Sequence, residues 1–293
     1  MAFKVPFIKL ENTQASILRE YISNDTWTKP DGLKELIVVC VGAGGGGGSG
    51  RNGANNVAKY GGGGGRGGSM VVDIIQASDL SSSISITVGS GGSGGAAITS
   101  PDTNGLAGTA GGDTSFGSFV IAKGGGGGQG GTSTAYGAGG SLQSGDTPSW
   151  VPNRLIGAPS AGDSALGRNG LDGQYATPSS GRSYSTNGTA TNAHRAGGGV
   201  YDGLTLISND TNAGTDGQNH VGKNIHFMLE ETGSYGIGTA GNGGGDGLKG
   251  GNGGNCGATG AGGGSNNLFN NNGGSGAGGN GGDGLVKLVE IYY

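Results

Sequence analysis

Short apolar segments, separated by long polar stretches rich in glycine, are the main pattern along this chain. Residues 83–88 alternate serine or threonine with isoleucine or valine, which predicts a strand with one buried face. Further runs of β-branched and apolar residues predict strands at 36–41, 70–75, 116–122 and 285–292. We expect a mainly β fold with almost no α-helix, built as one sheet or a two-layer sandwich.

Other segments carry a weaker strand signal. Residues 16–23 place four apolar side chains on one face of a helix, but the adjoining residues 27–30 fit a strand that enters a turn. We favour a strand for this segment. Residues 204–207 and 225–229 predict one more pair of short strands.

Glycine fills the stretches between the apolar segments, with 76 glycines among 293 residues. The main runs lie at 42–50, 61–68, 91–95, 124–131, 197–199, 241–264 and 273–284. Only 7 prolines are present, which excludes collagen. Extended helices with three residues per turn have no internal hydrogen bonds, so bare glycine backbones can approach closely and pair with one another. Disorder is the alternative for such a composition, but it does not explain why apolar strands punctuate the runs.

Composition and charge narrow the functional classes. Hydrophobic residues make up 32% of the chain, which is enough to fill one modest apolar core, and charged residues make up 12%. A net charge of −4 argues against a nucleic-acid partner, because such partners require clustered Lys and Arg. No apolar stretch reaches about 18 residues, and the first ten residues lack the pattern of a signal peptide.

The two cysteines, Cys40 and Cys256, lack the spacing of a metal site. We favour two reduced thiols over a disulfide bridge between them.

Several motifs resemble catalytic or cofactor sites without the context that such sites need. Residues 42–47 satisfy the glycine pattern of dinucleotide sites, but residues 48–53 cannot begin the helix that binds the pyrophosphate. Asp246 and Asp283 each lie in a partial match to a calcium-binding glycine repeat. Such a repeat binds calcium only when successive copies stack their Asp ligands, and these two matches are far apart in the sequence. His194, His220 and His226 lack the spacing of a helical zinc site. We therefore expect no catalytic residue, no metal, no cofactor and no enzymatic activity.

In combination, four segments resemble a known family. They are residues 27–32, 41–48 and 84–92, and the pair of short pieces 113–117 and 122–125. The chain from Trp27 to its end is similar to the glycine-rich domain at the tips of bacteriophage tail fibres and in their adhesins, as in T-even-like phages. This resemblance implies a β scaffold that carries stacked polyglycine II helices, with variable connecting loops that contact receptors on the bacterial surface. It divides the chain into an attachment and docking segment (1–26) and a receptor-binding domain (27–293).

Two functions follow as hypotheses. The first is a tail fibre tip adhesin that recognises lipopolysaccharide, capsule or an outer-membrane protein during host attachment. Its contact residues would be loop aromatics, because aromatic rings supply large contact area at low entropy cost and suit sugar faces. The candidates are Tyr136, Trp150, Tyr175, Tyr184 and Phe269. For each, the alternative is a ring that packs over glycine backbone. The second hypothesis is a structural virion protein of the decoration, tail-tip or baseplate kind, without receptor binding.

The resemblance also sets expectations for partners and location. Residues 1–26 would join other fibre or baseplate proteins, with the alternating Phe3, Val5, Phe7, Ile8 and Leu10 as a docking strand. The working unit would be one copy or a homotrimer. The protein would be assembled in the host bacterial cytoplasm and reside in the virion, at a tail fibre or tail tip.

Overall fold

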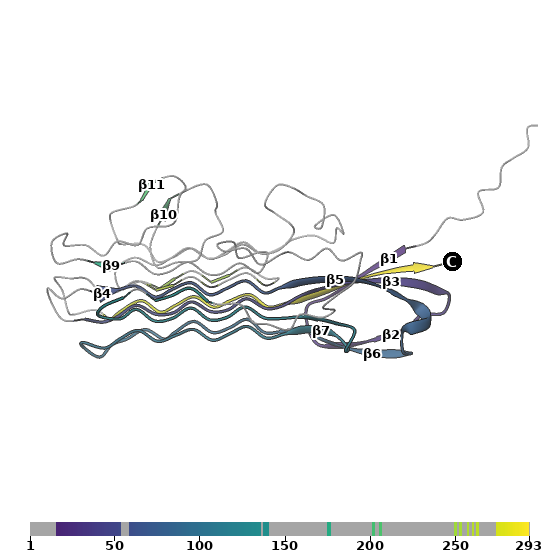
Figure 1. Ribbon diagram of the computed structural model, residues 1–293, viewed down its shortest axis with the longest axis horizontal. Helices are drawn as coiled ribbons and strands as arrows, with labels where there is room; N and C mark the ends of the chain where they lie inside the picture. Colours follow the sequence, from purple (N-terminus) through teal and green to yellow (C-terminus); the bar gives the residue numbers. More distant parts are fainter. Residues whose placement is uncertain are drawn as a thin grey trace, which may run out of the picture.

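The computed structural model describes residues 16–53, 59–135, 137–140 and 274–292, with short pieces at 175–176, 201–202, 205–206, 249–250, 252–253, 257, 260 and 262–263. The protein is elongated (Figure 1). Strands form one end, and glycine-rich runs continue from them along the long axis. No helix in the described part is long and apolar enough to span a bilayer.

Two antiparallel four-stranded sheets form a sandwich at the strand end. The first sheet has the order β1 (Ser16–Tyr21), β12 (Leu285–Tyr292), β3 (Leu33–Val41) and β5 (Met70–Gln76). The second has the order β2 (Asp25–Thr28), β6 (Ser83–Thr87), β7 (Thr114–Phe116) and β8 (Val120–Ala122). A short 3-10 helix, η1 (Ala77–Asp79), follows β5. The mainly β fold is thus confirmed, and its scaffold is the two-layer form.

The facing sides of the two sheets enclose one apolar core. Trp27 and Phe116 meet edge to face at its centre, with ring centroids 5.5 Å apart. The buried members of the core are Trp27, Leu33, Leu36, Val38, Cys40, Val71, Ile75, Leu80, Ile84, Ile86, Phe116, Val120, Ala122, Val286 and Leu288. Cys40 is a free thiol, as expected, and its burial raises its pKa. Cys256 lies outside the described residues.

Most of the predicted strands are present, with one correction. The strands expected at 36–41, 70–75, 83–88 and 285–292 are confirmed, as is a strand within 16–23. The single strand expected at 116–122 is wrong, because β7 and β8 form a hairpin there. Gly117 makes this reversal possible, since its φ of 53° lies in the left-handed region that side chains disfavour.

Two further pairs of short strands lie outside the sandwich. β4 (Lys59–Tyr60) pairs with β9 (Tyr175–Ala176). β10 (Tyr201–Asp202) pairs with β11 (Thr205–Leu206), which lies within the strand expected at 204–207. The partner of that strand is therefore β10, and residues 225–229 lie outside the described residues.

The glycine-rich runs form a hydrogen-bonded bundle around residues 42–52. Each N–H of this central run donates a hydrogen bond to a neighbouring run. Successive N–H groups donate in turn to the runs at 60–69, 103–112 and 276–282, and this order repeats every three residues. Its carbonyl oxygens accept from three other neighbours, which contain residues 92–95, 125–131 and 260–263. A period of three residues with six neighbours is the geometry of stacked polyglycine II helices. The expected glycine bundle is therefore present.

Close backbone contact explains why this bundle requires glycine. A Cβ atom placed on Gly42 would lie 2.1 Å from the carbonyl oxygen of Lys123, and one on Gly45 would lie 2.0 Å from that of Gly126. Backbone oxygen atoms cannot yield as the end of a flexible side chain can. The absence of a side chain, rather than unusual backbone dihedrals, is what these positions need.

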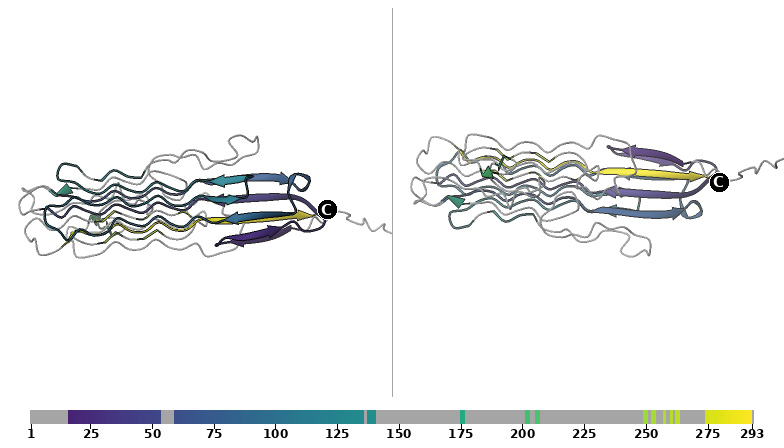
Figure 2. Two further views of the ribbon diagram at one scale, coloured as in Figure 1. Left: turned by 90° about the horizontal axis from the view of Figure 1, so that it is seen from below. Right: turned by 90° about the horizontal axis from the view of Figure 1, so that it is seen from above.

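Each long strand of the sandwich continues directly into a run of the bundle. β3 leads into residues 42–53 and β6 into residues 88–98, while the run at 274–284 leads into β12. Both views of Figure 2 show the runs side by side and aligned with the strands. The strands thus set the register of the bundle, and the bundle carries its distal turns to the far end of the molecule.

Candidate binding surfaces

The turns at the far end of the bundle form the first candidate surface, which we call the tip (residues 51–53, 59–60, 99–104 and 131–135). Asn52 and Thr103 exchange backbone hydrogen bonds of 3.0 and 2.8 Å. The guanidinium of Arg51, 7% exposed, pairs with the carboxylate of Asp102 and donates to the amide oxygen of Asn104. These contacts fix the 99–104 turn against the end of the central run.

A second turn lies beside this one. The backbone N–H of Thr132 donates to the carbonyl oxygen of Ala135 at 2.9 Å, and the Thr132 hydroxyl accepts from the Ala135 N–H at 2.9 Å. The N–H groups of Gly105 and Gly131 donate to Gly131 and Ser49, respectively, and so attach this turn to its neighbours. The tip is therefore a set of polar turns held on ordered backbone.

Most of the aromatic residues predicted to contact a receptor lie outside the described part of the chain. Tyr136, Trp150, Tyr184 and Phe269 lie outside the described residues. Tyr175 belongs to β9, whose backbone pairs with Tyr60 of β4 at the tip, while its side chain lies outside the described part. The role of the five aromatics as receptor contacts stays a prediction.

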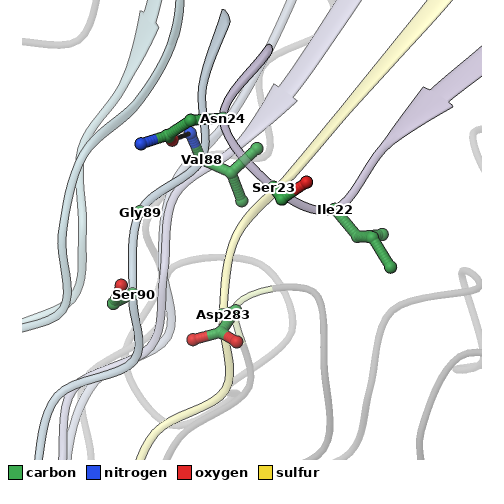
Figure 3. Close-up of a pocket in the computed structure, with 7 residues that line it drawn as sticks. All are labelled: Ile22, Ser23, Asn24, Val88, Gly89, Ser90 and Asp283. Carbon is green, nitrogen blue, oxygen red and sulfur yellow. Dashed lines mark hydrogen bonds between the residues drawn. The ribbon is translucent and has the colours of Figure 1, made fainter.

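The second candidate surface is a hollow of about 240 Å³ where the sandwich meets the bundle (Figure 3). We call it the junction hollow. It is lined by Ile22, Ser23, Asn24, Val88, Gly89, Ser90 and Asp283. The turn after β1, the exit of β6 and the run that enters β12 contribute these residues, which are far apart in the sequence.

Two side-chain contacts shape the junction hollow. The amide oxygen of Asn24 accepts a hydrogen bond of 2.8 Å from the Val88 N–H, which ties the β1–β2 turn to the exit of β6. The Asp283 carboxylate accepts one of 2.8 Å from the Gly91 N–H. Figure 3 places Asp283 and Ser90 on neighbouring runs at one end of the hollow, with Val88 and Ser23 at the other.

A partly buried ionic cluster lies at the opposite end of β12, around the buried carboxylate of Glu290. Glu290 accepts hydrogen bonds from Arg19 Nε at 2.6 Å, from Trp27 Nε1 at 2.8 Å and from the Tyr292 hydroxyl at 2.7 Å. Burial alone would raise the pKa of Glu290, but the three donors outweigh it and hold the pKa below its ordinary value. The cluster joins the two sheets, so its role is structural.

Two of the motifs that resemble nucleotide and metal sites lie in the described part of the chain. The N–H groups of residues 42–47, which a dinucleotide site would direct at phosphate, all donate to neighbouring runs. Asp283 uses one carboxylate oxygen to hold Gly91. Among the described residues, no three His, Cys, Asp or Glu side chains gather as a metal site would require.

The segment assigned to docking contributes to the sandwich itself. β1 pairs with β12 along its length, from Ser16 opposite Ile291 to Tyr21 opposite Val286. Residues 1–15 lie outside the described residues, and their docking role stays a prediction.

Sequence reasoning missed the junction hollow and the Glu290 cluster. The hollow is formed by three segments that are far apart in the sequence, so no local sequence pattern predicts it. The cluster did have a signal in the sequence, because the charged residue Glu290 interrupts a mostly apolar strand.

Comparison with known proteins identifies one family. A search of curated proteins finds none that matches this chain. The family described as "Glycine-rich domain" matches residues 20–289, from within β1 to within β12. Because this match spans nearly the whole chain, the protein belongs to the glycine-rich domain family.

Proposed function

We propose that the protein is the receptor-binding tip of a bacteriophage tail fibre, an adhesin that recognises a bacterial surface receptor during host attachment. In this proposal the tip and the loops around it contact lipopolysaccharide, capsule or an outer-membrane protein. The sandwich end faces the rest of the fibre or baseplate, with the N-terminal segment as the attachment point.

The polarity of the molecule is the observation that carries this proposal. The described ends of the chain, Ser16 and Tyr292, lie on paired strands at the sandwich end. The turns around Asp102 and Thr132 lie at the other end of the bundle. A scaffold with this polarity presents its turns away from whatever holds its chain ends, as a recognition tip requires.

The chemistry of the bundle supports the same function. Backbone hydrogen bonds at every residue of the central run leave little freedom in the scaffold, so its turns are positioned before a partner arrives. Preorganised loops lose less conformational entropy on binding, which favours affinity. In this proposal the bundle contributes placement of the turns.

The test is binding of the purified, fluorescently labelled full chain to a panel of bacterial strains, with and without removal of surface polysaccharide. We expect saturable binding confined to a subset of strains. Loss of binding after polysaccharide removal would identify a glycan receptor, and retention would identify an outer-membrane protein. The control variant is Ile74→Ala, an exposed position on β5 in the sandwich, which should bind as the wild type does.

A folded protein that binds no strain, either alone or assembled on its fibre, would contradict the proposal. That outcome would favour a structural virion role. Circular dichroism and a cooperative unfolding transition would establish that the labelled protein is folded.

A further inference from the structure

The junction hollow contains hydrogen-bonding atoms that the fold does not use. Asp283 accepts the Gly91 N–H through Oδ1, while its Oδ2 has no partner among the described residues. The hydroxyl groups of Ser23 and Ser90 also make no hydrogen bond within the described part. Three exposed residues with unused side-chain oxygens, Asp283, Ser23 and Ser90, therefore line the same small space.

The fold does not need a carboxylate at position 283. Three residues earlier on the same run, the amide oxygen of Asn280 accepts the Gly94 N–H at 2.9 Å, just as Asp283 accepts the Gly91 N–H. Asn280 does not line the hollow. A neutral amide thus performs the scaffold role, and the negative charge and second oxygen of Asp283 are available to a ligand.

We propose that the junction hollow binds a single neutral saccharide unit. The free oxygen of Asp283 would accept hydrogen bonds from sugar hydroxyls, and such charge-assisted bonds are stronger than neutral ones. The hydroxyls of Ser23 and Ser90 can donate or accept. Ile22, which is 69% exposed, and Val88 offer apolar surface to the C–H groups of a sugar ring.

The hollow has room for one sugar ring, and any further rings of a longer glycan would extend into solvent. Its volume of about 240 Å³ is below the roughly 300–1,000 Å³ of sites for drug-sized ligands. A calcium ion requires about six to eight oxygen ligands and is usually held by several carboxylates, whereas Asp283 is the one carboxylate residue among those that line the hollow. Phosphate and other anions would be repelled by the carboxylate.

This site is separate from the tip. It lies where the bundle leaves the sandwich, whereas the tip lies at the far end of the bundle. A test of saccharide binding at the junction hollow is therefore independent of whether the tip binds a receptor.

The test is an NMR titration of the ¹⁵N-labelled full chain with glucose, galactose, mannose and N-acetylglucosamine, in the presence of EDTA. We expect at least one sugar to shift the amide signals of Gly89, Ser90 and Gly91 with a millimolar Kd. Asp283→Asn should weaken that binding at least tenfold and remain folded, because Asn280 already shows the amide in this role. Asn280→Asp, which adds a charge outside the hollow, should bind the sugar as the wild type does.

Several outcomes would overturn the proposal. They are the absence of a shift at residues 89–91 with every sugar, equal weakening by Asp283→Asn and Asn280→Asp, and binding that appears only with added Ca²⁺. Sugar binding that survives Asp283→Asn would belong to another surface and would also refute the hollow as the site.

Discussion

Gly108 illustrates how single glycines hold the bundle together. It lies on the run at 103–112, where Gly105, Gly108 and Gly111 face the central run at every third position. A Cβ atom on Gly108 would lie 2.3 Å from the carbonyl oxygen of Gly46. The two runs would have to separate and lose hydrogen bonds to admit it.

We predict that Gly108→Ala lowers the free energy of unfolding by about 3 kcal/mol or more, through overpacking against a backbone atom. The measurement is urea denaturation followed by circular dichroism. The control is Ala107→Ser at the adjacent exposed position, which should change stability by no more than about 0.5 kcal/mol. Equal stability of the two variants would contradict the close approach of the runs.

Glu290 leads to a prediction about pH. Its pKa is lowered in the folded protein because Arg19, Trp27 and Tyr292 donate hydrogen bonds to its carboxylate, against the opposing effect of burial. The resulting stabilisation is complete above the ordinary glutamate pKa of about 4.3 and is lost as the pH falls through the lower folded value.

Glu290→Gln should therefore lower stability by about 2 kcal/mol at pH 7 and flatten the decline below pH of about 4.3, because it removes charge-assisted hydrogen bonds. Urea denaturation at a series of pH values measures both effects. Glu35→Gln, at a partly exposed position of β3, serves as the control and should keep the wild-type pH dependence. A variant that retains the full acid sensitivity would assign it to other groups.

At the scale of elements, the runs of the bundle differ in how many N–H groups they use. Every N–H of residues 42–52 donates to a neighbour. On the outer run at 103–112, the N–H groups of Asn104, Ala107 and Ala110 make no hydrogen bond within the described part of the chain, while those between them do. Side chains at these outward positions also prevent a further run from packing there.

Amide hydrogen exchange should reveal this difference. We predict fast exchange at Asn104, Ala107 and Ala110, slow exchange at the residues between them, and uniformly slow exchange at 42–52, because unpaired amides exchange without any opening of the structure. Exchange followed by NMR at neutral pH measures the pattern. Uniform exchange along residues 103–112 would contradict the three-residue period.

Sequence patterns predicted the strands better than their connections. The alternation at residues 83–88 and the β-branched run at 36–41 identify strands because burial on a sheet imposes those patterns directly. The hairpin at Gly117 was missed, since β7 and β8 have only three residues each and read as one apolar segment. The pairing of glycine runs is invisible in the sequence, because bare backbones carry no side-chain pattern to distinguish one partner from another.

At the scale of the whole molecule, the proposed receptor contact leads to one prediction. Replacing Tyr136, Trp150, Tyr175, Tyr184 and Phe269 together by alanine should abolish binding to susceptible strains, because aromatic anchors supply most of the energy at such contacts. Cell-binding assays with the labelled variant measure the effect. Sugar binding at the junction hollow should be unchanged, which provides an internal control for folding. Cell binding equal to that of the wild type would refute these loops as contacts.

The candidate surfaces were predictable to different degrees at this scale. A glycine scaffold that displays loops follows from the spacing of apolar and glycine-rich segments. The junction hollow does not, because Ser23, Ser90 and Asp283 meet only once the sandwich and the bundle have formed. Sites built from distant segments require the register of the runs, which depends on the strands that lead into them.

The direction of the bundle's hydrogen bonds has a mechanical consequence. The runs lie along the long axis, and the bonds that join them cross it (Figures 1 and 2). A pull between the far turns and the sandwich therefore loads whole rows of bonds in shear, so that they resist together and cannot be unzipped one at a time. A molecule anchored at β1 and β12 and held at its other end would stretch little before its sandwich gave way.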